Sequence, residues 1–311
     1  MNNFINQYRS RGYFNISNIF NLEEIKFLRS RLEEEYKLIK YKKRDLFIND
    51  LKNKDLIKLI LKGFNSKSVR DLSKAFSKAY DNKVTILPFF NVMRNYHVDL
   101  TKTHGWHRDC GGELAYKYCR DILTKKNYLF SKCGFYLQEN SDYYGGAIDI
   151  IEESNKFLEK TDFFSRKINL LSIKMMQTIH KFNKKIYKFF YEGKIRFLKG
   201  YKTLYPQLGS AVFFDSRILH RGTVGKVFRA KDFVNDYQAN INNQEKIKFA
   251  IYAHFGTSEA IDSYMHDRLK RHNNQNEINL WLDQINFIKD YEFDLYEDVI
   301  DIFKNIKRKY C

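Results

Sequence analysis

The spacing of apolar residues along this chain is helical near the N-terminus, extended in the middle and helical again towards the C-terminus. Apolar side chains recur every three or four positions over residues 22–40, which predicts a helix whose capping box starts at Asn21. A short strand over 11–16 precedes this helix. A second helical stretch, 54–80, is broken or kinked near Gly63.

From residue 86 the pattern becomes a series of short segments rich in Val, Ile, Phe and Tyr, separated by Gly and Asn or Asp. The predicted strands are 86–96, 132–138, 147–151, 210–215 and 246–255. Many short strands with polar turns favour an α+β protein with a double-stranded β-helix core, that is, a cupin-like jelly roll. Helices flank this core at the N-terminus and over the C-terminal extension 258–311. The mouth of such a sandwich is a common place for a ligand pocket.

Residues 156–205 form a basic helical insertion between two predicted strands. They contain thirteen Lys or Arg against three Asp or Glu, a net charge of +10, and an apolar stripe at helical spacing over 166–191. One interpretation is a helix that packs its stripe on the sandwich and leaves its lysines in water. The other is a basic lid over the pocket, which gathers an anionic substrate or contacts an anionic membrane.

Composition favours one globular domain over 1–311. Of the 311 residues 43% are hydrophobic and 16% aromatic, enough for a substantial core, and two prolines leave no sign of a linker. Residues 1–20 lack the features of a secretory signal, and no stretch is apolar for long enough to span a bilayer, so we expect a cytoplasmic protein. The four cysteines lack zinc-site spacing and are expected to be reduced.

The formal net charge of +18 raises the question of a polyanionic partner. Lys, Asn, Ile, Phe and Tyr are all abundant, so a drift in the composition of the whole proteome explains much of the excess. No zinc-finger spacing or other nucleic-acid-binding signature is present, and we expect no specific nucleic-acid partner. A basic nucleic-acid-binding protein and a non-catalytic jelly-roll binding protein remain the alternatives to an enzyme.

His107, Asp109 and His220 are the candidate metal ligands. Residues two apart on a strand point to the same face, so His107 and Asp109 can share a metal ion that a distant histidine completes. Two imidazoles and one carboxylate on one side of a metal leave the opposite positions open, as non-heme Fe(II) oxygenases require. By the same alternation, His104 and Arg108 point away from the metal. His254 lies in a core strand and is interpreted as structural.

Three segments, in order, resemble the phytanoyl-CoA dioxygenase family of Fe(II)/2-oxoglutarate-dependent oxygenases. The first is Trp106-His-Arg-Asp109, which is similar to the family's His-x-Asp motif. The second is 134–156, which resembles its strand, glycine turn and strand, although Glu153-Ser-Asn155 stands where the family has a Gly-Ser-His type signature. The third is 208–223, which resembles the run into the distal histidine. The likeness extends from residue 8 to residue 255 and leaves out the insertion and the C-terminal helices.

The resemblance implies a dioxygenase that uses Fe(II), 2-oxoglutarate and O2, with His107, Asp109 and His220 as iron ligands. Lys248 stands where the family usually has the arginine that pairs with the far carboxylate of 2-oxoglutarate. Arg229 and Lys226 are the alternatives for that role, and Thr223 offers a hydroxyl to the same carboxylate. Because Asp109 fills the position that halogenating relatives leave to a halide, hydroxylation of a C–H bond is favoured.

The basic insertion suggests a small or amphipathic, anionic substrate, such as an acyl, lipid or sugar-linked metabolite. Substrate identity is otherwise open.

Overall fold

The structure is a computed structural model of the whole chain. It describes residues 2–41, 43, 45–94, 107–109, 128–142, 145–155, 171, 200–224, 247–272, 275–291, 301 and 304–305.

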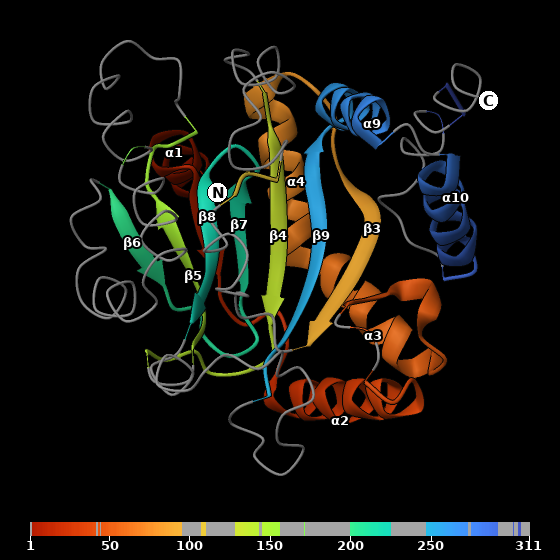
Figure 1. Cartoon of the computed structure of the whole chain (residues 1–311). Coiled ribbons are helices and arrows are strands. Elements are labelled where there is room, and N and C mark those ends of the chain that lie inside the picture. The colour runs from red at the N-terminus through yellow and green to blue at the C-terminus, as the bar shows by residue number, and fades with distance from the viewer. Residues whose placement is uncertain are drawn as a thin grey trace.

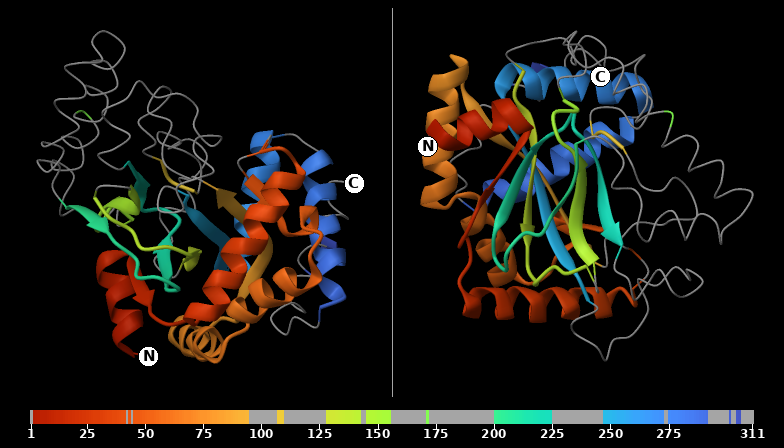
Figure 2. Two further views of the ribbon diagram at one scale, coloured as in Figure 1. Left: turned by 90° about the horizontal axis from the view of Figure 1, so that it is seen from below. Right: turned by 90° about the vertical axis from the view of Figure 1, so that its left-hand side faces the viewer.

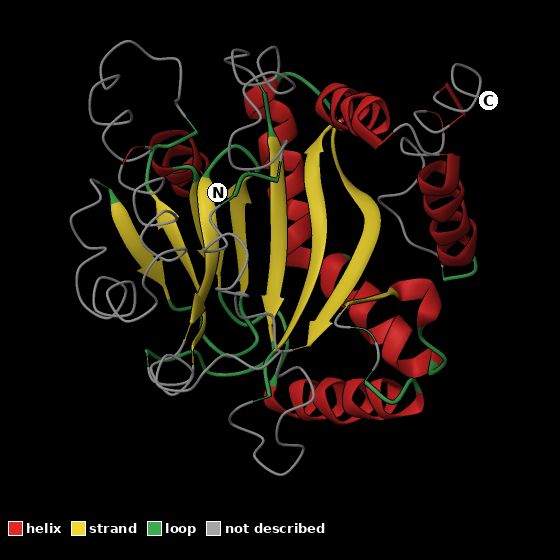
Figure 3. Ribbon diagram, viewed as in Figure 1, coloured by secondary structure: helices red, strands yellow, loops and turns green. Residues whose placement is uncertain are grey.

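Helices flank a β-rich middle section, as Figures 1 and 3 show. The elements are α1 (Asn2–Arg11), β1 (Tyr13–Ile16), α2 (Leu22–Leu38), β2 (Asp45–Phe47), the 3-10 turn η1 (Ile48–Asp50), α3 (Lys54–Phe64), α4 (Lys67–Tyr80), β3 (Val84–Arg94), β4 (Phe130–Tyr136), β5 (Gly145–Ile151), β6 (Tyr201–Leu204), β7 (Ala211–Asp215), β8 (Leu219–Val224), β9 (Phe249–Thr257), α9 (Ser258–His272) and α10 (Gln275–Lys289).

Within the described residues the strands form two antiparallel sheets. The larger has the order β1-β7-β4-β9-β3-β2 and the smaller the order β6-β5-β8. After β4 the chain passes to β5 and β6 in the smaller sheet, returns to β7, crosses to β8 and returns again to β9. The two sheets are therefore interleaved in the sequence.

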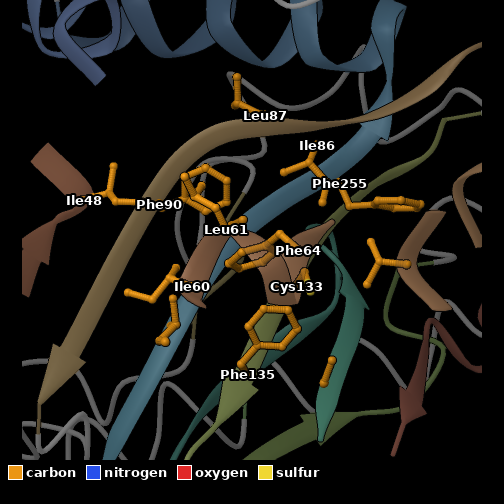
Figure 4. Close-up of a cluster of buried hydrophobic side chains, with 14 of the residues drawn as sticks. Ile48, Ile60, Leu61, Phe64, Ile86, Leu87, Phe90, Cys133, Phe135 and Phe255 are labelled. Atoms are coloured by element: carbon orange, nitrogen blue, oxygen red, sulfur yellow. The ribbon is translucent and has the colours of Figure 1, made fainter. Parts of the chain in front are cut away.

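Helices cover one face of the larger sheet, and the smaller sheet lies on the other side (Figure 2). Side chains that alternate along the strands, among them Phe135, Phe213 and Phe255, pack with α2, α3, α4, α9 and α10 into the main core. Figure 4 shows Phe64 of α3 among Phe90 of β3 and Phe135 of β4. The Phe64 and Phe135 ring centroids are 4.2 Å apart.

A second apolar cluster fills the space between the two sheets. The larger sheet contributes residues such as Tyr136, Phe214 and Tyr252, and the smaller sheet contributes Ile148 and Ile150. These are the positions that alternate with the main-core residues, so the central strands β4, β7 and β9 contribute to apolar clusters on both faces. Side chains on this inner face are held between the sheets.

Most of the predicted elements are confirmed. Asn21 and Glu24 form the capping box of α2. The predicted break falls between α3 and α4, at Asn65 and Ser66. Gly63 itself is helical, and it is needed because a Cβ there would come within 2.2 Å of the Phe20 ring. The five predicted strands correspond to β3, β4, β5, β7 and β9, and the C-terminal helices to α9 and α10.

Other elements differ from the predictions. Helix α1, the three-residue strand β2 and the strand β8, which carries His220, were not anticipated. Tyr201–Leu204, at the end of the predicted insertion 156–205, forms β6 and pairs with β5. Apart from Leu171, the helix expected over 166–191 lies outside the described residues.

No described helix combines the length with the apolar composition that crossing a membrane demands.

Candidate metal centre

Three side chains that are far apart in the sequence converge beside the smaller sheet. One potential ligand atom from each of His107, Asp109 and His220 lies within 4.8 Å of the other two. Nε2 of His107 is 3.6 Å from Oδ1 of Asp109, and Nε2 of His220 is 3.7 Å from Oδ2. The three residues can therefore offer two imidazole nitrogens and one carboxylate oxygen to a single metal ion.

The backbone brings the two histidines together without any help from a metal. The amide of His107 donates to the carbonyl of His220 at 2.9 Å, and the amide of His220 donates back at 3.0 Å. His107 thus forms an antiparallel bridge to β8. On the other side of β8, His220 lies opposite Ile150 of β5, whose side chain is in the cluster between the sheets. This pairing turns His220 inward.

A hydrogen bond fixes the tautomer of His220. Its Nδ1 lies 3.1 Å from the carbonyl oxygen of Ile218. A carbonyl only accepts, so Nδ1 carries the proton and Nε2 presents its lone pair to the site. Metal-binding histidines commonly have this arrangement. Burial, reinforced by the nearby His107, lowers the pKa of His220 to about 3, so the imidazole is neutral at pH 7.

Asp109 is the candidate anionic ligand. Burial opposes the ionisation of its carboxyl group, but Lys132 and the neighbouring histidines favour the charged form and hold its pKa well below the ordinary value. Its side chain is 12% exposed, and that of His107 is 45% exposed. The site is therefore closed around Asp109 and His220 and open on the side of His107.

The donor set fits a divalent transition metal. Oδ2 of Asp109 is buried and accepts no hydrogen bond from any group in the described part of the chain, and the Lys132 ammonium lies 3.5 Å from it, beyond a good hydrogen bond. A buried carboxylate oxygen without a hydrogen bond is costly unless a cation satisfies it. Two neutral imidazoles and one carboxylate make the ligand set that suits iron and similar metals.

Ser154 joins the two segments that carry the ligands. Its hydroxyl accepts a hydrogen bond at 2.7 Å from the amide of Leu219, the residue before His220. Its carbonyl accepts one at 3.2 Å from the guanidinium of Arg108, which lies between the other two ligands. Arg108 therefore points away from the metal position, as predicted. The sequence singled out Ser154 only as part of a motif and gave no sign of its two partners.

Lys132 of β4 is a site residue that the sequence analysis missed. Its Nζ lies 3.5 Å from Oδ2 of Asp109 and 4.8 Å from the centre of the Tyr252 ring. The sequence feature that could have pointed to it is a single lysine in the strand Phe130–Tyr136, where most residues are apolar. The pairing of this strand with its neighbours, which places Lys132 beside Asp109, could not be read from the sequence.

Lys248 lies just before β9, with its side chain between the two sheets. The residue is 3% exposed. Its Nζ donates to the carbonyl of Glu139 at 3.0 Å, and its stem passes so close to Gly146 that a Cβ there would lie 3.1 Å from Cδ. Lys248 is an even number of residues from Ala250 and Tyr252, so its side chain points to the same side of the sheet, towards the smaller sheet. This places a buried cation on the same inner face as Lys132.

Thr223 is not brought to the metal ligands. It is three residues from His220, so its side chain points to the opposite face of β8. There its hydroxyl donates to Oδ1 of Asp149 at 2.8 Å, while Arg221 pairs with Oδ2 at 2.9 Å. Arg229 and Lys226 lie outside the described residues.

His254 is buried and stacks on an aromatic ring. Its ring centroid is 5.0 Å from that of Phe130, with the planes 9° apart. This agrees with the interpretation of His254 as a structural residue. His104 lies outside the described residues.

No protein-family model matches the sequence, and a comparison with curated proteins gives no match either. Several solved structures are similar to the chain at low sequence identity. One is SnoK, a non-heme α-ketoglutarate-dependent carbocyclase from nogalamycin biosynthesis, at 12% identity over 83% of this chain and 84% of that chain, with a TM-score of 0.47.

HygX from Streptomyces hygroscopicus, solved with nickel and 2-oxoglutarate, is 11% identical over 83% of this chain and 87% of its own, with a TM-score of 0.47. EctD from S. alaskensis, solved with 2-oxoglutarate and 5-hydroxyectoine, is 10% identical over 82% of this chain and 75% of its own, with a TM-score of 0.45. Likeness at this level says nothing about chemistry, so the function has to be argued from the side chains of the site.

Proposed function

We propose that this protein is a non-heme Fe(II)- and 2-oxoglutarate-dependent dioxygenase that hydroxylates a C–H bond of a small or amphipathic anionic substrate. The observation that carries the proposal is the convergence of His107, Asp109 and His220, with Nε2 of His220 turned towards the other two. A site with these ligands and an open side can bind an oxo-acid and dioxygen together. Of the three proposed ligands, His107 is the most exposed to solvent.

The interleaving of the two sheets supports a jelly-roll core for this enzyme. Within the class we relate the chain to the phytanoyl-CoA dioxygenases, on the order of its three motif segments. The predicted cytoplasmic location and the peripheral membrane contact through 156–205 are part of the same proposal.

The residues of the site have separate tasks. His107, Asp109 and His220 would hold iron, and Lys248 would pair with the far carboxylate of 2-oxoglutarate as a point charge. When bound, Fe(II) with 2-oxoglutarate and O2 supplies the chemistry that oxidises the co-substrate to succinate and carbon dioxide and hydroxylates the substrate. Phe214, whose ring centroid is 4.6 Å from that of His220, helps to keep water from the inner side of the ligands.

The test is anaerobic titration of the purified protein with Fe(II) and then 2-oxoglutarate, followed by the weak visible charge-transfer band of an oxo-acid chelated to iron. We expect the wild type to give this band. We expect His107→Ala to lose it and to bind iron more weakly by over 100-fold, because changing residues that merely support ligands already costs about 10- to 100-fold. His266→Ala is the matched control, since His266 pairs with Asp262 within α9.

Equal iron binding by the wild type and His107→Ala would overturn the proposal. Retention on a polyanion column that falls steeply with salt, in a protein that does not bind iron, would instead favour the nucleic-acid-binding alternative. Substrate-dependent release of succinate across a panel of acyl, lipid and sugar-linked metabolites would then identify the substrate.

A further inference from the structure

Lys132 is a cation placed directly beside the proposed metal. Its side chain is 19% exposed and lies between the Asp109 carboxylate and the face of the Tyr252 ring. The flanking residues Ser131 and Cys133 are fully buried. Placing an ammonium group in such a strand costs solvation energy, which Asp109 and the aromatic face offset. Iron ligation alone does not require a lysine at this position.

Lys132 changes the net charge of the metal centre. With neutral imidazoles, Asp109 and a divalent metal give a charge of +1. The ammonium of Lys132 raises this to +2. A dianion that binds the open side of the metal without reaching Lys248 then neutralises the centre, whereas without Lys132 the same dianion would leave one excess negative charge in a partly buried site.

We infer that Lys132 sets the charge of this centre so that the metal-loaded protein selects dianionic chelators, at the expense of affinity for the metal itself. The inference rests on the proposed function. The ammonium repels a divalent cation and competes with it for Oδ2 of Asp109, but it attracts the carboxylates of an incoming ligand. Lys132 therefore acts as a positioning and selectivity residue, separate from the role proposed for Lys248.

This role makes two opposite predictions for Lys132→Met. The variant should bind Ni(II) or anaerobic Fe(II) about tenfold more tightly, and its metal complex should bind dianionic chelators about tenfold more weakly, as expected for removing one nearby charge. A purely structural role for Lys132 would weaken both. Lys132→Arg keeps the charge and should behave like the wild type.

The experiment is calorimetric titration with metal alone, followed by titration of the metal complex with oxalate and with 2-oxoglutarate. Oxalate has no distal carboxylate for Lys248, so its affinity reports on Lys132. Lys202→Met is the matched control. Lys202, on β6, also lies beside a carboxylate and an aromatic ring: its Nζ is 3.4 Å from Glu152 and 5.6 Å from the centre of the Tyr13 ring. It should change neither affinity.

The results separate this inference from the proposed function. If the wild type binds no metal, both fail. If the wild type binds metal and both chelators but Lys132→Met shows equal affinities, or loses affinity for metal and chelators alike, only the inference about Lys132 is overturned. Opposite changes in Lys132→Met, with wild-type values in Lys132→Arg and Lys202→Met, support it.

Discussion

The imidazole of His220 shows how a single side chain is prepared for metal binding. It is buried, its Nδ1 proton is held by the carbonyl of Ile218, and its low pKa keeps Nε2 unprotonated across the physiological range. The side chain of His107, by contrast, is exposed to solvent. We therefore expect His220 to fix the metal position and His107 to close the site from the solvent side.

The low pKa of His220 predicts how the metal-free protein responds to acid. In the unfolded chain this imidazole takes up a proton near its ordinary pKa of 6.5, but in the native state only near 3. Below pH 6.5 the unfolded state therefore binds one more proton, and the free energy of unfolding falls by about 1.4 kcal/mol per pH unit. Above pH 6.5 this contribution to stability is fully present.

Urea unfolding of His220→Gln in the presence of a chelator, between pH 7 and pH 4.5, checks this expectation. The variant should lose stability less steeply than the wild type as the pH falls, and His266→Gln should follow the wild type. Parallel curves for His220→Gln and the wild type would contradict a buried, neutral His220.

Residue types and spacing in the sequence singled out His107, Asp109 and His220 as candidate ligands. The strand expected under His107 and Asp109 is not present, because His107 forms an isolated bridge to His220 and Asp109 lies in a turn. Thr223 was a candidate for the 2-oxoglutarate carboxylate. It lies three residues from His220 on β8, a strand that the sequence did not predict, and its hydroxyl donates to Asp149. Lys132 could not be found from residue types and spacing. Its contact with Asp109 depends on how separate segments lie against each other, and no local pattern reports that.

At the scale of elements, predictions succeeded where a local signal was strong. The capping box of α2 and the change of period at β3 are such signals. Helix α1 has no acidic residue in its first turn and buries only Ile5 and Tyr8, so its pattern is weak. Strand β6 has four residues at the end of a lysine-rich stretch, and it is a strand because β5 offers it a partner.

The turn after β5 contacts the start of β8 through Ser154, so we expect a change in this turn to affect the position of His220. Ser154→Ala removes the acceptor for the buried amide of Leu219, which should cost about 1–3 kcal/mol of stability. It should also weaken metal binding about tenfold, since the start of β8 positions His220. Thermal unfolding and metal titration measure the two effects.

Ser210→Ala is the control for Ser154→Ala. The hydroxyl of Ser210 donates to the carbonyl of Gln207, in the turn before β7. Its loss should lower stability without changing metal affinity. If Ser154→Ala also keeps wild-type metal affinity, the turn does not position the ligands.

At the scale of the whole molecule, the proposed ligands connect the two sheets. His220 lies on β8 of the smaller sheet and His107 is bridged to it, while Lys248 lies just before β9 of the larger sheet. A metal ion with 2-oxoglutarate would therefore link both sheets, whereas the metal alone would bind beside one. The metal ion should therefore stabilise the fold first, and 2-oxoglutarate should stabilise it further once the metal is bound.

Thermal unfolding with Ni(II), and with Ni(II) plus 2-oxoglutarate, tests this link. Each addition should raise the melting temperature of the wild type. Lys248→Met should keep the increase due to metal and lose most of the increase due to 2-oxoglutarate. An increase with 2-oxoglutarate in the absence of metal, or an unchanged increase in Lys248→Met, would contradict the proposed arrangement.

The net charge of +18 is a property of the whole molecule that the fold does not require. The interleaved sheets and their two apolar clusters follow from alternating positions, which are independent of the lysine content. The segment 156–199, which carries much of the excess charge, lies outside the described residues apart from Leu171. Its interpretation as a lid or a membrane contact therefore stays a prediction.

The paired backbone hydrogen bonds between His107 and His220 hold these two proposed ligands side by side before any metal binds. The conformational entropy lost when these two distant segments come together is lost during folding. Metal binding therefore does not have to order them. Uptake of the ion should then be governed by the loss of its hydration water, and the apoprotein should have the same hydrogen-exchange protection at these two amides as the loaded form.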